Sequence, residues 1–262
     1  MEKLIYLVWD RPSLSGADVR TQYLEDLAPK LLALTPRGLQ MDLDDDDAQV
    51  PSMVPVPGDE LPVRALVSIW VDAHDTRAEY EAILAAAGVR RAGYLVTESL
   101  YRDYGDNEHA PARDWADGTR SPGIVTLSVF DKPSGVTDEA FFGHWYGHQS
   151  PMSEAMQPRT RYVRNAVARA LTPGAPRYRA IVEEAWSDTE ILTDMNKFFG
   201  ATDPGELGER IRIMLDSTKL LYDPATMRNY TLSEYILKTP RDPNRREYTA
   251  NSAVQSRRFD IS

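Results

Sequence analysis

The segment FFGHWYGHQSPM, residues 141–152, brings two histidines and several aromatic side chains together. Phe141, Trp145 and His148 are spaced at i, i+4 and i+7, which places them on one face of an α-helix. His144, at i+3, lies on the same face. Because this face carries the largest apolar groups, we expect it to pack against a sheet and both imidazoles to point inward. Burial lowers the pKa of a histidine, and a neutral imidazole near pH 7 is a good general base.

Other interpretations of these histidines stay open. Either imidazole could be a hydrogen-bonded structural group without a chemical role. A His-x-x-x-His pair on a helix also has the spacing of a metal site. However, HWYGH has no glutamate after its first histidine, and no third ligand is apparent. We therefore predict no metal at this pair.

The strand expected after this helix supplies two further candidates. Alternation along residues 159–171 points Tyr162 and Arg164 to one face of the sheet and Val163 and Asn165 to the other. Tyr162 could position a carbonyl or a phenol, or simply pack in the sheet. Asn165 is a candidate substrate contact.

Other strands carry polar groups of the same kind. Thr126 and Ser128 share a face of the strand predicted over residues 123–130. Their hydroxyls either line a pocket or only make local hydrogen bonds. Glu234 is a further candidate contact near the end of the chain. Glu98 stands at the matching place in the first half, which favours a structural role for both.

Matching segments recur in the same order along the chain. The pairs are VWDRPS (8–13) with VFDKPS (129–134), WVD (70–72) with WSD (186–188), and YLVTE (94–98) with YTLSE (230–234). One match could be chance, whereas three in order indicate two copies of one unit.

Hydrophobic patterns predict the same elements in each copy. The first copy has strands at 3–9, 37–43, 63–71 and 93–101 and helices at 16–34 and 76–87. The second copy has strands at 123–130, 159–171, 178–186 and 227–237, a helix at 137–156 and a broken helical region at 188–221. This β-α-β-β-α-β order is the ferredoxin-like split motif.

A ferredoxin-like sheet has helices on one face only, so its other face needs cover. We expect an α+β protein in which two such repeats pack sheet to sheet as an internal pseudo-dimer, a dimeric α+β barrel. The predicted units are repeat 1 (1–101), a linker (102–122), repeat 2 with the pocket (123–238) and an extended C-terminal arm (239–262).

The pattern F-x-x-x-W-x-x-H-x-x-P, ending at His148 and Pro151, resembles the EthD-type family of dimeric α+β barrels. The segment LYDP (221–224) before the last strand is similar to that family's C-terminal signature. The resemblance implies a cofactor-independent lyase, isomerase or cyclase acting on a small aromatic, lactone or polyketide-like substrate. It also implies a ligand between the sheet and its first helix.

The first half departs from this pattern. When Tyr23 is aligned with Trp145, Asp26 stands opposite His148. We therefore expect one competent pocket, in the second half.

These observations lead to one functional hypothesis with two alternatives. His148 acts as general acid or base, and Tyr162 and His144 orient the substrate and stabilise an oxyanion. The expected contacts with the substrate are Phe141, Trp145, Thr126, Ser128, Asn165 and Glu234. The alternatives are a protein that only binds a small molecule, and a haem- or oxygen-dependent oxidase with a buried histidine as axial ligand.

Composition narrows the setting. The net charge of −10 and pI of about 5.0 disfavour nucleic acid and anionic membranes as partners. The chain has no cysteine, which suits a reducing cytoplasm. Neither a signal peptide nor an apolar run long enough to cross a membrane is apparent. We expect a cytoplasmic protein with a small-molecule partner, and a homodimer is possible.

Overall fold

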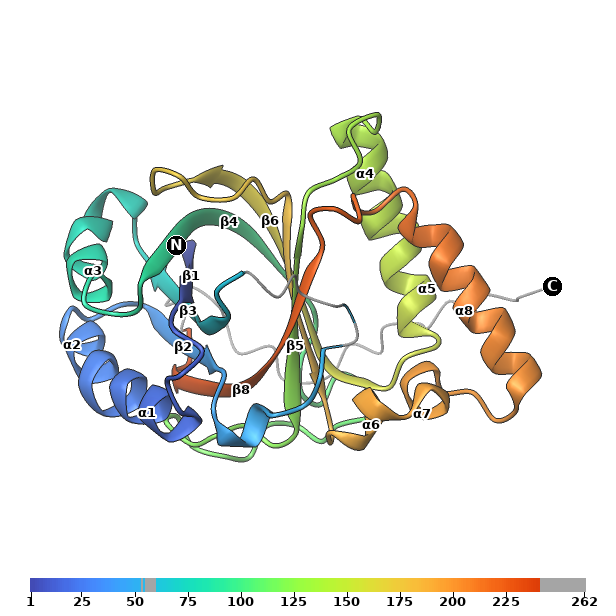
Figure 1. Cartoon of the computed structure of the whole chain (residues 1–262), viewed down its shortest axis with the longest axis horizontal. Helices are drawn as coiled ribbons and strands as arrows, with labels where there is room; N and C mark the ends of the chain where they lie inside the picture. Colours follow the sequence, from blue (N-terminus) through green and yellow to red (C-terminus); the bar gives the residue numbers. More distant parts are fainter. Residues whose placement is uncertain (53, 55–59, 241–262) are drawn as a thin grey trace, which may run out of the picture.

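The computed structural model describes residues 1–52, 54 and 60–240, and its centre is a closed antiparallel barrel (Figure 1). The strand order around the barrel is β1-β3-β2-β8-β5-β7-β6-β4. The strands are β1 (Glu2–Trp9), β2 (Gly38–Leu43), β3 (Val63–Val71), β4 (Arg90–Arg102), β5 (Ile124–Phe130), β6 (Arg159–Ala170), β7 (Ala180–Trp186) and β8 (Arg228–Lys238).

The helices lie outside the barrel, in two groups on opposite sides (Figure 1). Those of the first half are α1 (Gly16–Arg20), η1 (Thr21–Leu27), α2 (Ala28–Ala33), η2 (Asp46–Ala48), η3 (His74–Thr76) and α3 (Arg77–Leu84). Those of the second half are α4 (Asp138–His144), η4 (Trp145–Gln149), α5 (Ser150–Glu154), α6 (Glu190–Thr193), α7 (Met195–Phe199) and α8 (Pro204–Thr218). Each predicted strand and helix is confirmed within a few residues of its expected ends.

The barrel closes because the two groups of four strands pair at both edges. One seam joins β2 to β8, with Met41 opposite Tyr235, and the other joins β4 to β6, with Glu98 opposite Asn165. Hydrogen bonding at both seams removes the exposed strand edges that an open sheet would have. Whether the halves are copies of one ferredoxin-like unit stays a prediction, as do the boundaries of the units. The predicted arm falls, from residue 241 onward, outside the described residues.

Alternation along each strand creates an interior and an exterior core. Side chains such as Leu7, Tyr94 and Leu232 fill the interior of the barrel. The outward-facing side chains of the first half pack under α1–α3, around Tyr23 and Leu31. In the second half, the exterior core lies under α4, η4 and α5 and is largely aromatic, with Phe130, Phe141, Trp145 and Tyr162.

One end of the barrel interior holds charged groups rather than apolar ones. Lys3 lies 2.9 Å from Glu98 and 3.1 Å from Glu183, and Arg161 lies 2.7 Å from Glu234. Burial and the nearby carboxylates raise the pKa of Asp42 well above its ordinary value. Of these pairs, Lys3–Glu183 joins the two halves, whereas Lys3–Glu98 lies within the first half and Arg161–Glu234 within the second.

The first helix of each half, formed by α1, η1 and α2 or by α4, η4 and α5, contains a widened turn. The backbone N–H of Ser150 donates to the carbonyl of Trp145, five residues back, and Ala28 does the same to Tyr23. Such i→i+5 bonds define a π-helix. A proline follows each widened turn, and a proline inside a regular α-helix lacks a donor and clashes with the carbonyl four residues back. The wider turn relieves that conflict.

No helix in the described ranges, with their gaps at 53, 55–59 and beyond 240, combines the length and apolar character needed to cross a membrane.

Candidate functional site

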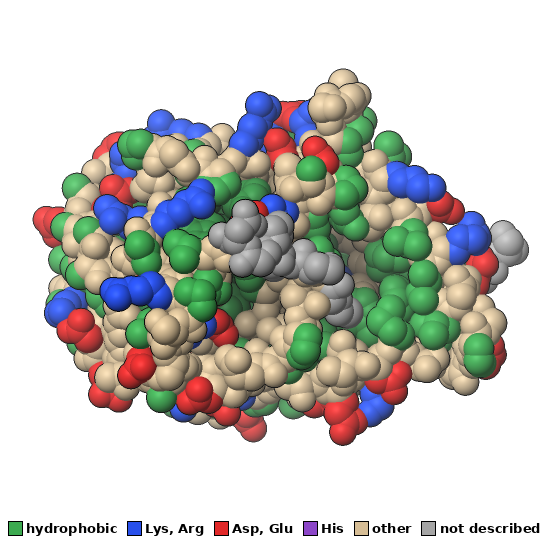
Figure 2. Space-filling view, in the orientation of Figure 1, with side chains coloured by type: hydrophobic (Ala, Val, Ile, Leu, Met, Phe, Trp, Pro, Cys, Tyr) green, Lys and Arg blue, Asp and Glu red, His purple; other side chains and the backbone are tan. Residues whose placement is uncertain are grey.

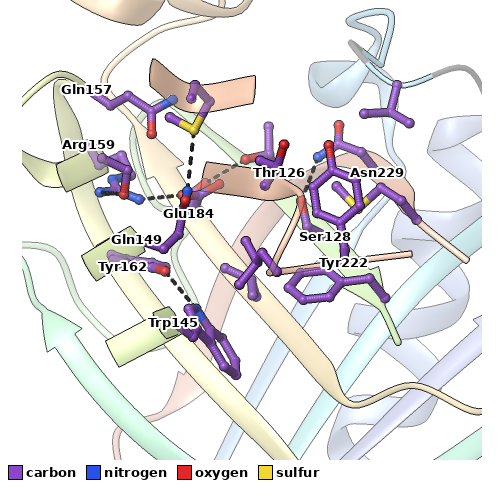
Figure 3. Close-up of a pocket in the computed structure, with 18 of the residues that line it drawn as sticks. Thr126, Ser128, Trp145, Gln149, Gln157, Arg159, Tyr162, Glu184, Tyr222 and Asn229 are labelled. Carbon is purple, nitrogen blue, oxygen red and sulfur yellow. Dashed lines mark hydrogen bonds and ion pairs between the residues drawn. The ribbon is translucent and has the colours of Figure 1, made fainter. Parts of the chain in front are cut away.

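A cavity of about 210 Å³ lies between the outer face of the second-half strands and the helices η4, α5 and α8 (Figure 3). Trp145, Phe130 and Tyr162 provide aromatic walls, and Met214 and Thr218 come from α8. This is the region in which a pocket was expected. In the first half, the corresponding region under α1–α3 holds buried side chains such as Tyr23 and Leu27.

An ion pair lies at one end of the cavity. Nη1 of Arg159 lies 2.5 Å from Oε1 of Glu184, and Nη2 donates to Ser153 and to Glu154. Burial opposes the positive charge of Arg159, but the two carboxylates outweigh it and raise the pKa of the guanidinium. Arg159 is therefore a fixed cation beside Glu184.

Tyr162 lies next to this pair and its hydroxyl is held inside the protein. Arg159 stands 4.1 Å from the centre of its ring. The indole N–H of Trp145 donates to the hydroxyl at 3.3 Å, and Oγ of Ser150 lies 3.2 Å away. Burial raises the pKa of Tyr162, so the phenol stays protonated. Both sides of the hydroxyl are therefore occupied by groups of the protein itself.

The opposite end of the cavity is less charged (Figure 3). Asn229 donates to Oγ of Ser128 at 3.0 Å, and the ring of Tyr222 lies 5.7 Å from that of Phe130. A ligand here would meet aromatic surface with hydroxyl and amide groups beside it.

Several polar groups of the lining have hydrogen-bonding capacity that no described residue uses. Within the described part of the chain, Oε2 of Glu184, the side-chain amide of Gln157 and the hydroxyl of Tyr222 have no hydrogen-bond partner. A carboxylate can accept a proton, and an amide or phenol can donate to an oxyanion. The set is suited to acid–base chemistry at a carbonyl or a phenol.

The expectation that His148 points inward is wrong. Its side chain is exposed on the outer surface, while Gln149 and Ser150 are buried. The cause is the π-turn, because i, i+4, i+7 spacing assumes 3.6 residues per turn. The extra residue in the turn after Trp145 moves Gln149, rather than His148, onto the buried face.

His144 is half-buried but faces a different neighbour from the one expected. Its Nε2 lies 2.9 Å from the carbonyl of Ser217 on α8, and so carries the proton and donates there. Burial lowers the pKa of His144, the bond to Ser217 partly opposes this, and the charge of His148 adds to the lowering. Ser217 in turn donates to Gln149, which lines the cavity. The imidazole thus ties α8 to the helix beside the cavity.

The structure divides the remaining predicted residues between two compartments. Thr126 and Ser128 line the cavity together with Trp145 and Tyr162, whereas Phe141 is buried behind Trp145 at a ring distance of 5.5 Å. Two other predicted contacts do not reach the cavity.

Asn165 and Glu234 point into the barrel interior, on the other side of the sheet. Asn165 donates to Glu183 at 2.8 Å, and Glu234 accepts from Arg161, Tyr104 and Ser121. Their partners belong to the buried charged cluster at the end of the barrel, so neither side chain contacts a ligand in this cavity.

Sequence reasoning missed Glu184, Arg159 and Gln157. A signal was present in IVEEAW, residues 181–186, where two adjacent glutamates stand in an apolar strand. Adjacent strand residues face opposite sides. Since both sides of this sheet are covered, Glu183 and Glu184 must each be held by a partner, and one of them faces the helices.

The donor set of the cavity does not fit a histidine-ligated haem. No histidine is among the cavity-lining residues in the described part of the chain, and His144 and His148 point elsewhere. Over the same residues, no group of three or more His, Asp or Glu side chains has a metal-binding arrangement. The haem alternative, which required a buried axial histidine, is therefore not supported here.

Comparisons with known proteins show the fold but no family. No family model matches the chain, and neither does any curated protein. Among solved structures, an anthrone oxidase-like protein aligns with a TM-score of 0.52 and 11% identity over 90% of both chains.

Two other solved structures align less closely. A candidate monooxygenase from Fusobacterium nucleatum has a TM-score of 0.44 and 9% identity, over 90% of this chain and 92% of that chain. A dye-decolorizing peroxidase from Bacteroides thetaiotaomicron has a TM-score of 0.43 and 10% identity, over 90% and 93%. The present chain shares its barrel fold with the anthrone oxidase-like protein.

Proposed function

We propose that this protein is a cofactor-independent enzyme that moves a proton on a small aromatic ketone or phenol in the second-half cavity. The observation that carries the proposal is the position of Glu184. Arg159 fixes its carboxylate through one oxygen, and the other, beside the cavity, has no hydrogen-bond partner among the described residues. Glu184 takes the role of general acid or base that the sequence suggested for His148, because the exposed side chain of His148 cannot reach a ligand in this cavity.

In this mechanism Glu184 removes a proton from the carbon next to a carbonyl, or from a phenolic hydroxyl. The amide of Gln157 and the hydroxyl of Tyr222 are the groups available to donate to the oxyanion that forms. One such donor contributes roughly 10²–10³ in rate. Trp145 and Phe130 supply aromatic surface against the substrate ring. Return of the proton at another atom gives isomerisation, and loss of a leaving group gives elimination.

Cavity size limits the substrate. A cavity of roughly 150 Å³ holds benzene, and pockets for drug-sized ligands begin near about 300 Å³. The volume of about 210 Å³ therefore suits one or two rings. Anthrones, which appear in the name of the aligned oxidase-like protein, are three-ring aromatic ketones with an acidic CH₂ group, so their chemistry agrees with the proposal although their size exceeds this cavity.

We further propose that the protein acts in the cytoplasm, and that its two halves descend from one ferredoxin-like unit of the EthD type. Each half has the same order of strands and helical segments, and in each π-turn the carbonyl of an aromatic residue, Tyr23 or Trp145, accepts an i→i+5 bond. A proline follows both turns, at Pro29 and Pro151. These shared details support common descent.

Hydrogen exchange tests the proposal without knowledge of the natural reaction. The two-ring ketone 2-tetralone is incubated with protein in D₂O, and loss of the proton signal next to its carbonyl is followed by NMR. Wild-type protein should accelerate the exchange, Glu184→Gln should lower that acceleration by roughly 10²-fold or more, and His148→Ala should leave it unchanged. Equal acceleration by wild type and Glu184→Gln would rule out Glu184 as the base.

A second candidate function is binding without turnover. It is favoured by the engagement of the Tyr162 hydroxyl with Trp145 and Ser150, and by the pairing of Glu184 with Arg159. If the ketone binds in the cavity and wild-type protein gives no acceleration of exchange, the cavity stores a ligand and performs no proton transfer on ketones of this kind.

A further inference from the structure

A second cavity, of about 310 Å³, lies at the other end of the second half. It is bounded by the hairpin between β6 and β7, by the loop from β5 to α4, and by Tyr94 of β4. It shares no lining residue with the cavity beside Glu184. The proposed reaction does not use it.

The charge of this second cavity is opposite in sign to that of the whole chain. Its lining includes four cations, namely Lys132, Arg169, Arg177 and Arg179, and two carboxylates, Asp131 and Asp138, which leaves a local excess of two positive charges. The chain as a whole carries −10. A concave basic site on an acidic protein concentrates anions locally, because low-dielectric walls focus the field.

The two carboxylates are already shared among several donors. Asp138 lies 2.6 Å from Arg179 and 3.7 Å from Lys132. Asp131 lies 3.3 Å from Arg177 and also accepts from the backbone N–H of Lys132 at 2.9 Å. The internal acids therefore do not neutralise all the cations.

Arg169 is the clearest case of a cation in this cavity without a carboxylate partner in the described part of the chain. Its guanidinium donates to Nε2 of His74, and no carboxylate of the described ranges lies within ion-pair distance of it. Guanidinium groups remain charged and form paired hydrogen bonds with carboxylate or phosphate. Arg169 is thus a cation at the cavity with capacity for an external oxyanion.

The remaining wall is apolar and aromatic. The rings of Tyr94 and Tyr178 stand 6.0 Å apart, and Val167 and Pro176 add aliphatic surface. The hydroxyl of Tyr94 donates to the carbonyl of Pro176 at 2.9 Å, which holds the ring in place. A ligand here can set its charged group against the cations and its body against this wall.

We propose that this cavity is a binding site for a small organic oxyanion, a carboxylate or a phosphate monoester with a compact apolar body. Arg169 and Lys132 contact the oxyanion, and Arg179 is the third cation within the cavity wall. Asp138 competes with the ligand, because it occupies Arg179 and lies near Lys132. The site is independent of the proposed proton-transfer reaction.

The test uses the full-length protein and NMR of its backbone amides. Inorganic phosphate, benzoate and phenyl phosphate are titrated separately at low salt. The amides of the non-proline residues in 167–179 should shift with saturable binding below about 10 mM, and phenyl phosphate should bind more tightly than phosphate alone. Tighter benzoate than phenyl phosphate would identify a carboxylate ligand, and the reverse order a phosphate ester. Failure of all three probes to shift these amides would overturn the proposal.

Matched variants distinguish specific binding in this cavity from non-specific attraction of anions to surface cations. Arg169→Gln and Lys132→Gln should each weaken phenyl phosphate binding by about fivefold, and Asp138→Asn should strengthen it by about the same factor. Arg212→Gln, an exposed change on α8, should have no effect. Equal losses in Arg212→Gln and Arg169→Gln, or unchanged affinity in both Arg169→Gln and Lys132→Gln, would contradict the assignment.

Discussion

Nη1 of Arg159 lies 2.5 Å from Oε1 of Glu184, in the wall of the second-half cavity. The side chain of Arg159 is 1% exposed and that of Glu184 is 18% exposed, so water reaches the carboxylate but not the guanidinium. This asymmetry leaves Glu184 as the charged group that a ligand can touch. Because the guanidinium is fully buried, removal of either partner would leave an uncompensated charge in the cavity wall.

Replacement of Arg159 by methionine should destabilise the protein by roughly 3 kcal/mol, because it leaves Glu184 without its counter-charge while preserving most of the buried volume. Urea unfolding measures the change. Arg212→Met is the control, since the side chain of Arg212 is 61% exposed and its ion pairs contribute little. Equal unfolding free energies for the two variants would show that the Arg159 pair is not a stabilising contact.

Replacement of His148 by alanine should leave both thermal stability and ligand binding unchanged, because the side chain lies on the outer surface. Trp145→Ala, in the same turn, should cost roughly 3–5 kcal/mol, because Trp145 is fully buried in the aromatic core. The melting temperature of His148→Ala tests the π-turn, and Trp145→Ala serves as the reference for a buried residue of the same helix. A strongly destabilised His148→Ala would mean that the imidazole is buried after all.

The stability of the fold should fall in mild acid, because His144 becomes protonated more readily in the unfolded chain than in the folded one. Burial lowers the folded-state pKa of His144 below its ordinary value of 6.5. The unfolded chain therefore takes up the proton first, so this contribution is present above pH 6.5 and is lost as pH falls through the folded-state pKa. His144→Gln, whose amide can still donate to Ser217, should show less loss of melting temperature between about pH 7.5 and pH 5. Identical pH profiles for wild type and variant would refute this role.

Asp42 should have the opposite pH dependence. Burial and the carboxylates of Glu183 and Glu234 raise its folded-state pKa well above 3.8. The folded state then holds the extra proton, so the contribution is present in acid and is lost as pH rises toward the folded-state pKa. Asp42→Asn, which is permanently neutral, should gain stability relative to wild type as pH increases from about 5 to about 8. A constant difference across this range would mean that Asp42 is ionised in the fold.

The fold could be predicted because its signals are local and periodic. The apolar runs 3–9 and 63–71 give strands by composition, and the order of elements then leaves few ways to cover the sheets. Closure into one barrel depends on hydrogen bonds at the two seams, as between Met41 and Tyr235. No short segment of sequence specifies those partners.

The site could be predicted only in part, and the reason lies in one helix turn. Trp145 and Tyr162 were found because aromatic residues on a predicted interior face must be buried. Regular α-helical spacing puts His148 on the buried face, but the π-turn after Trp145 moves it to the surface. Pro151 is a sequence signal for that turn, because a proline is not tolerated inside a regular α-helix. Glu184 escaped notice because its role depends on Arg159, a partner 25 residues away.

The central claim is that a small aromatic ligand enters the cavity beside Trp145 and Glu184. The most direct measurement is the indole N–H resonance of Trp145, assigned with Trp145→Phe, during titration with 2-tetralone. The resonance should shift with saturation in wild-type protein and stay unchanged in Val182→Phe, where a larger side chain fills the cavity wall. An unshifted indole resonance in wild type, or equal shifts in a folded Val182→Phe variant, would contradict the account.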